Sequence, residues 1–188
     1  MSKIPFYYYL PIIAIPLMLM FYYEKPNSNV QIVFPDTNEF YIDDYDIYLT
    51  TDSDWEEADP GSFDLKITNN DCYFGVMAYN SVDLAKKWTP ETLYEWHNED
   101  VFSRRQNVEI IDPCISYSKD GKNYTYTLFS AEKDDDKNYY GSCMITFDST
   151  DEKMVWVLFA ALPSYVIENE DYILDIIYSI DIDLTSEF

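Results

Sequence analysis

The chain has 188 residues and a formal net charge of −23, from 35 Asp and Glu against 12 Lys and Arg. A field of this sign repels phosphate backbones, so we expect no nucleic-acid partner. With 47% hydrophobic and 18% aromatic residues, the chain is too apolar for a disordered acidic tail, and we expect it to fold with its carboxylates on the surface.

The first segment of the chain predicts a membrane anchor. Ile4 to Tyr23 carries no charged residue, and as a helix it matches the roughly 30 Å of a bilayer's hydrocarbon. Aromatic residues stand at both ends, Tyr7 to Tyr9 and Phe21 to Tyr23, where their rings favour the headgroup levels. Prolines at two inner positions predict a bent helix.

A cleaved secretory signal and a buried helix of a soluble protein are the alternatives for this segment. Lys3 supplies the charged start of a signal, but FYYEKPNSN follows the apolar core where the small residues of a cleavage site belong. Lys3 also favours an N-terminus on the cytoplasmic side. We therefore expect a single-pass anchor in the cell membrane over residues 1–25, a linker over 26–39 and one extracytoplasmic domain over 40–188.

Apolar patterns predict the strands of this domain. Some runs alternate as half-buried strands do, whereas Cys72–Asn80 and Met154–Ala161 are apolar on both faces, as central strands are. In chain order the expected strands are Tyr45–Leu49, Phe63–Ile67, Cys72–Asn80, Val108–Ser118, Lys122–Ala131, Tyr139–Asp148 and Met154–Ala161. Asp120-Gly121 predicts a two-residue hairpin between two of them.

Two helices are expected to cover the sheet. Thr89 can cap the first, Pro90 suits its first position, and the helix runs to about Ser103. Its apolar face is expected to consist of Leu93, Trp96 and His97. The second opens at Pro163 and Ser164 and turns one isoleucine stripe toward the sheet: Ile173, Ile176, Ile177 and Ile180. The fold class is therefore α+β, with helices on an antiparallel sheet.

Two tryptophans are the candidates for a binding surface. Trp55 and Trp88 lie near expected loops and could form an exposed platform for a sugar or a peptide, with core packing as the alternative. Trp96 and Trp156 are assigned to the core. His97 is the only histidine and has no cysteine or carboxylate at a metal-binding offset besides its helix neighbours. We expect no catalytic residue and no cofactor, because motifs for a serine triad and a phosphate loop are missing.

Acidic clusters and cysteines give weaker indications. Asp134, Asp135 and Asp136 are weak candidates for calcium, since the spacing of a calcium loop is not present, and solubility is the alternative. Cys114 and Cys143 fall on strands separated by a third, about 9 to 10 Å apart and beyond the roughly 7 Å limit for a disulfide. We interpret these two and Cys72 as small buried hydrophobes.

The order of these elements resembles the photosystem PsbP and Mog-type family from Phe40 to Leu184. The resemblance depends on SDWEEAD, FDLKI, CYFGVMAY, TPETLYEW, GKNYTYTLF, MVWVLFA and YSIDI. It implies an α/β/α sandwich around an antiparallel sheet, used mostly to bind other proteins and without an established catalytic centre. No ligand residue of the plant proteins can be placed on this chain, and the membrane segment departs from the small GTPase-binding members.

Three functions follow as hypotheses. The first is a membrane-anchored, extracytoplasmic, non-enzymatic interaction module that binds a protein partner as an accessory to a cell-surface or membrane complex. The second is an envelope hydrolase that uses a carboxylate pair on a glycan or a peptide. The third is a surface protein that binds calcium weakly.

Overall fold

The computed structural model describes residues 37–81, 84, 88–133 and 136–183. The expected anchor over residues 1–25 lies outside this part of the chain. Among the described residues, no helix combines the length and the apolarity that crossing a bilayer requires.

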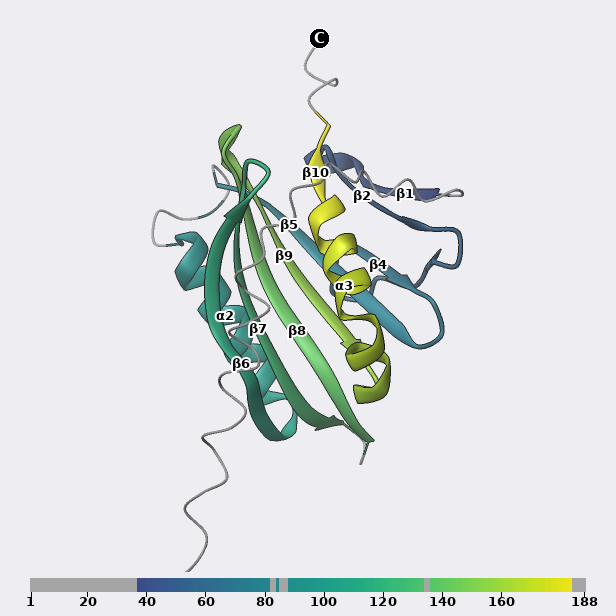
Figure 1. The fold of residues 1–188 in the computed structure, drawn as a ribbon. Helices are drawn as coiled ribbons and strands as arrows, with labels where there is room; N and C mark the ends of the chain where they lie inside the picture. The colour runs from purple at the N-terminus through teal and green to yellow at the C-terminus, as the bar shows by residue number, and fades with distance from the viewer. Residues whose placement is uncertain (1–36, 82–83, 85–87, 134–135, 184–188) are drawn as a thin grey trace, which may run out of the picture. The chain divides into compact units, whose positions relative to one another are not determined.

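A seven-stranded sheet forms the centre of the domain, and all its pairings are antiparallel. Its spatial order is β3-β4-β5-β9-β8-β7-β6 (Figure 1). In chain order its strands are β3 (Glu56–Glu57), β4 (Leu65–Thr68), β5 (Cys72–Asn80), β6 (Gln106–Lys119), β7 (Lys122–Lys133), β8 (Asp136–Phe147) and β9 (Thr150–Ala161). The doubly apolar β5 and β9 lie next to each other at the centre, as their sequences predict.

A smaller sheet has the order β1-β2-β10. It contains β1 (Thr37–Ile42), β2 (Ile47–Asp52) and the two-residue β10 (Asp181–Ile182), with a 3-10 turn η1 (Asp43–Tyr45) between the first two. Ile47 and Leu49 of β2 are buried, and both pack into the same core as β4 and β5. Thr37 lies inside the expected linker over 26–39, so the ordered strand begins earlier than the sequence pattern indicates.

One helix packs on each face of the large sheet, α2 behind it and α3 in front in the view of Figure 1. Helix α2 (Pro90–Ser103) begins at the predicted cap, where Thr89 Oγ1 accepts from Thr92 N at 3.3 Å and Thr92 Oγ1 accepts from Thr89 N at 2.8 Å. Helix α3 (Pro163–Ser179) buries Ile173, Ile176 and Ile177 against the sheet, as its stripe predicts.

The sheet divides the apolar interior into two cores. Alternate residues of β5, β8 and β9 face α3 and the small sheet, and the others face α2. The α3 core includes Trp55, Phe74 and Phe159, whereas the α2 core includes Trp156 and Phe129. The structure therefore confirms an α+β fold with an antiparallel sheet between two helices.

The predicted hairpin is confirmed, and two burial predictions are wrong. Asp120 and Gly121 both have positive φ, 52° and 76°, as a two-residue hairpin turn requires. Trp96 is 47% exposed and does not belong to the core, because α2 buries the stripe formed by Leu93, His97 and Val101 instead. Cys114 is exposed, because β6 is an edge strand that is exposed along most of its length.

Candidate functional site

A cleft of about 600 Å³ opens between α2 and the sheet, on the face opposite α3. We call it the α2 cleft. Its volume lies in the range of small-molecule and peptide-anchor pockets. Its walls come from the end of α2, from the loop before β4 and from β4, β5 and β9. The lining includes Asp59, Phe63, Lys66, Tyr73, Trp96, His97, Asp100, Arg104, Arg105 and Trp156.

Stacked rings form the floor of the α2 cleft. His97 lies flat on Trp156, with ring centroids 3.9 Å apart and an interplanar angle of 7°. Phe63 is also nearly parallel to Trp156, at 6.1 Å and 16°. Gly75 leaves the space for Phe63, because a Cβ at that position would lie 2.5 Å from the Phe63 ring. The floor is therefore flat, aromatic and closely packed.

His97 contributes no charge to this floor at neutral pH. Burial lowers its pKa from 6.5 to about 4, against an opposing effect of Asp100. Its Nε2 lies 2.6 Å from the hydroxyl of Tyr79, and the side chain is 3% exposed. The imidazole is therefore neutral, hydrogen-bonded and stacked within the floor.

Trp96 forms an exposed aromatic edge of the α2 cleft. Its ring meets His97 edge-on at 4.9 Å, and Trp88 lies against it at 5.8 Å and 72°. Trp88 is partly buried against the α2 core and packs beside the cleft. Of the two predicted platform residues, Trp88 therefore lies next to the α2 cleft. The exposed ring at the cleft belongs to its neighbour Trp96.

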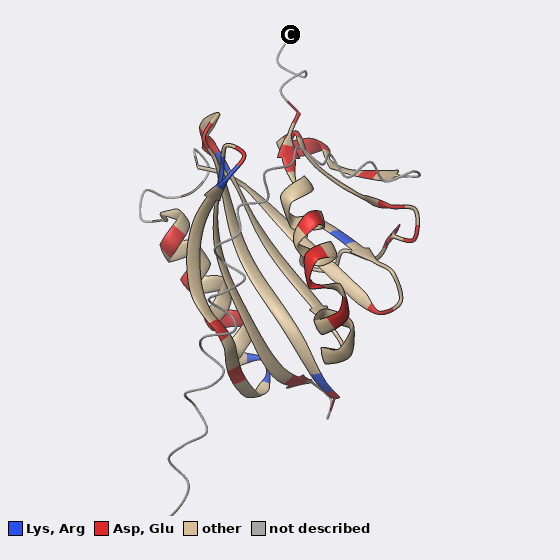
Figure 2. Cartoon of the chain, viewed as in Figure 1, with Lys and Arg blue, Asp and Glu red and all other residues tan. Residues whose placement is uncertain are grey.

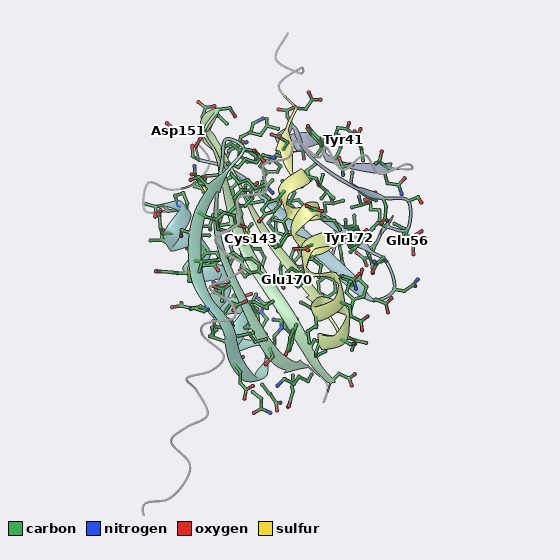
Figure 3. All side chains as sticks on the ribbon, viewed as in Figure 1. Tyr41, Glu56, Cys143, Asp151, Glu170 and Tyr172 are labelled. Carbon is green, nitrogen blue, oxygen red and sulfur yellow. The ribbon has the colours of Figure 1, made fainter. Side chains whose placement is uncertain are left out.

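Trp55, the other predicted platform residue, is 1% exposed, so the expectation of an exposed ring there is wrong. Its ring packs edge-on against Phe74 at 5.3 Å in the α3 core. Its Nε1 donates to the Tyr172 hydroxyl at 2.6 Å, and that hydroxyl donates to Asp52 Oδ2 at 2.6 Å. Figure 3 labels Tyr172 on α3. Because Tyr172 satisfies the indole N–H, Trp55 can be buried although it lies in a loop.

Basic side chains collect at the α2 cleft. Arg104 and Arg105 are the only arginines of the chain, and both line it together with Lys66. Arg104 pairs with Asp100, through Nη2 at 2.6 Å and Nε at 3.0 Å. Arg105 donates Nη1 to the Val101 carbonyl at 2.8 Å, and its Cζ lies 4.3 Å from the centroid of the Tyr140 ring. The second guanidinium is thus held by the protein without a carboxylate.

Tyr73 lies near two of these cations, Lys66 and Arg105. Lys66 Nζ is 5.4 Å from the centroid of its ring. Burial raises the pKa of Tyr73, while the charge of Arg105 lowers it, which places the guanidinium close to the phenol. Within the described residues, neither Lys66 nor Arg105 has an ion pair. The α2 cleft therefore offers two uncompensated cations beside an aromatic floor.

The sequence analysis did not identify Lys66, Arg104 or Arg105 as site residues. The available signal was composition: the only two arginines of a strongly acidic chain are adjacent and follow directly on the predicted helix. Of the calcium candidates, Asp134 and Asp135 lie outside the described residues, and Asp136 is exposed at the start of β8. No group of three or more potential metal ligands occurs in the described part of the chain.

A carboxylate with a raised pKa occurs on the other face of the sheet. Partial burial raises the pKa of Glu170, and the charges of Asp112 and Asp171 raise it further. Glu170 lies on α3, in the centre of the view in Figure 3. It does not line the α2 cleft. The carboxylates of Glu170, Asp112 and Asp171 are thus separate from the α2 cleft.

No family model matches the chain, and no curated protein matches it in sequence. Three solved structures are similar in fold. Cyanobacterial PsbP from Synechocystis sp. PCC 6803 is 10% identical, with a TM-score of 0.59 over 84% of this chain and 99% of that chain. LpqN of Mycobacterium tuberculosis, involved in cell envelope biogenesis, is 12% identical, with a TM-score of 0.54 over 84% and 99%.

The Ran-binding protein Mog1p of Saccharomyces cerevisiae is 12% identical, with a TM-score of 0.50 over 81% of this chain and 98% of that chain. All three similarities extend over nearly the whole of the other chain, so the likeness concerns the complete domain. The domain of this chain therefore has the PsbP and Mog-like fold that the sequence resemblance implies.

Proposed function

We propose that this protein is a membrane-anchored, extracytoplasmic binding module, an accessory to a cell-surface or membrane complex, and that its protein partner docks at the α2 cleft. One observation carries the proposal: the cleft joins the exposed Trp96 to the only two arginines of the chain. Trp and Arg are the side chains most enriched at the energetic centres of protein interfaces.

The fold and the first segment support the rest of the proposal. Two proteins with this fold are described as Ran-binding and as involved in cell envelope biogenesis, which are roles in binding and at the envelope. Function does not follow from fold alone, so the proposed protein-binding role depends mainly on the residues of the α2 cleft. The uncharged stretch from Ile4 to Tyr23, with Lys3 before it, supports an anchor with its N-terminus in the cytoplasm.

Photo-crosslinking in intact cells tests the docking site. Trp96 is replaced by benzoylphenylalanine, which keeps an aromatic group at an exposed position of the α2 cleft. The control carries the same group at Ile167, which is 70% exposed on α3 on the opposite face of the sheet. We expect a discrete crosslinked protein at position 96 and none at position 167. Equal crosslinking at both positions, or none at position 96, would refute the docking site.

A further inference from the structure

We propose that the partner segment that enters the α2 cleft is an acidic peptide, with an Asp or Glu carboxylate next to an aromatic side chain. This inference rests on the proposed function and specifies the chemistry of its ligand. Three independent features of the cleft lead to it: the local reversal of charge, the fixed position of one guanidinium, and the aromatic floor beside it.

The charge of the α2 cleft is opposite to that of the molecule. Figure 2 shows many acidic positions on α3, on the small sheet and at the ends of strands, and few basic positions. The cleft is lined by three basic residues, Lys66, Arg104 and Arg105, and by two acidic residues, Asp59 and Asp100. The chain as a whole has 35 acidic and 12 basic residues. The net negative charge of the protein repels an acidic peptide elsewhere on its surface. We therefore expect such a peptide to bind at the α2 cleft. Charge complementarity of this kind favours the correct partner and its orientation.

Two uncompensated cations line the α2 cleft and could attract one carboxylate. Lys66 and Arg105 both lie near Tyr73, and Arg105 is fixed by its bond to Val101 and by the Tyr140 ring. Arg105 Nε is buried and has no hydrogen-bond partner among the described residues. Its edge with Nη2 is the edge that grips a carboxylate in two-point pairs. A carboxylate of the bound segment supplies an acceptor for this guanidinium, and Lys66 adds a second positive charge in the same cleft.

The ring of the peptide fits the remaining lining of the cleft. Phe63 and the exposed Trp96 border a floor in which His97 and Trp156 are stacked. The buried His97 is neutral and therefore adds no further cation to the cleft. Aromatic pairs contribute about 0.5 to 1.5 kcal/mol beyond the area they bury. Because cations and rings line a single cavity, the carboxylate and the ring must be close together in the bound segment.

Three fluorescent peptides of equal length test the inference on the full-length protein in detergent. All are amidated at the C-terminus; the first alternates Asp or Glu with Phe, the second has Asn and Gln in place of the acids, and the third has Lys. We expect the acidic peptide to bind at least tenfold more tightly than the neutral one, and the basic peptide to bind no better than the neutral one. Equal or tighter binding of the basic peptide overturns the inference, since the net charge of the protein then governs binding.

Variants locate the binding site. Lys66→Gln and Arg105→Gln are each expected to weaken binding of the acidic peptide at least fivefold, whereas Lys137→Gln, which removes an exposed cation outside the cleft, is expected to leave it unchanged. Arg105→Lys keeps the positive charge but loses the paired donors of the guanidinium. It replaces Arg105→Gln in the binding assay if that variant does not fold. Trp96→Ala is expected to weaken the acidic and the neutral peptide alike. Unchanged affinity in the Lys66 and Arg105 variants overturns the inference.

Two further outcomes separate the inference from the proposed function. Phenylacetate as a competitor identifies the source of the carboxylate: if it binds at the α2 cleft while the acidic peptide does not, the ligand is a small organic acid and the peptide is excluded. If position 96 crosslinks to a partner in cells but the three peptides bind equally, the docking site stands and its proposed chemistry is wrong.

Discussion

His97 is a polar side chain that is buried within an aromatic stack. Its ring lies flat on Trp156, and the Tyr79 hydroxyl satisfies one ring nitrogen. Burial keeps the imidazole neutral, because the charged form would lose its hydration. The same burial links the stability of the protein to pH.

We predict that His97 makes the protein less stable as the pH falls from about 6.5 to about 4. In this window the unfolded chain protonates the imidazole and the folded chain does not, so protons favour unfolding. The loss should reach roughly 2 to 3 kcal/mol at pH 4 and be absent above pH 7. Urea denaturation of the native protein and of His97→Phe over this range measures it, since the effects of the carboxylates cancel in the difference. Parallel pH profiles for the two proteins would contradict the prediction.

At the residue scale, only part of the candidate site was predictable from the sequence. The pattern correctly assigned Trp156 to the core, but it exchanged the roles of Trp55 and Trp96. Trp55 follows a polar, acidic stretch that indicates a loop, and only the hydroxyl of Tyr172, 117 residues later, makes its burial possible. Trp96 shares helical spacing with Leu93, yet the buried stripe of α2 includes the polar His97 and Asn98, which a hydrophobic pattern does not count.

At the element scale, the C-terminal end of α3 depends on a side chain from another element. The last turn of α3 contains no basic residue. Lys122, at the start of β7, is 6% exposed and donates its Nζ to the carbonyls of Tyr178 at 3.0 Å and Ile180 at 2.7 Å. It also pairs with Asp181 at 3.1 Å. A cation from the sheet therefore meets the negative end of the helix dipole.

We predict that Lys122→Met destabilises the protein by about 2 to 4 kcal/mol, because it removes the donor to one buried and one partly buried carbonyl. The free energy of unfolding in urea measures this effect. Lys119→Met is the matched control: its exposed ammonium lies 3.5 Å from the centroid of the Tyr178 ring, and its loss should cost less than about 1 kcal/mol. Equal losses in the two variants would show that Lys122 does not stabilise the end of α3.

Long, regular elements were predictable and short ones were not. The sequence located α2 from Thr89 and Pro90, and it located β5 from an apolar run between turn residues. It missed β1 and β10. In β1 exposed and partly buried residues alternate until Ile42, and β10 has two residues, so neither carries a recognisable pattern. Both form because they pair with the edges of β2, a long-range event that local sequence does not encode.

For the whole molecule, the proposed compartment can be tested with the three cysteines. Cys72 and Cys143 are buried, and burial raises the pKa of both thiols, which makes them unreactive. Cys114 is exposed on β6. Cys114, which the sequence pattern had placed in the core, is therefore the one exposed thiol of the domain.

We predict that a membrane-impermeant maleimide labels the protein in intact cells freed of their wall, and that Cys114→Ser abolishes the labelling. The physical reason is access, since only an extracytoplasmic domain meets the reagent. Mass spectrometry of the purified protein identifies the modified residue. Labelling that requires permeabilised cells would place the domain in the cytoplasm and refute the extracytoplasmic part of the proposal.

The arrangement of β5 and β9 has a consequence for synthesis of the chain. β5 needs β9 as its neighbour, and β9 begins only at Thr150. Until that segment has left the ribosome, a nascent chain presents the unpaired edge of an apolar strand, which invites aggregation. The large sheet can therefore close only after β9 has been synthesised, and until then the apolar β5 is exposed to aggregation.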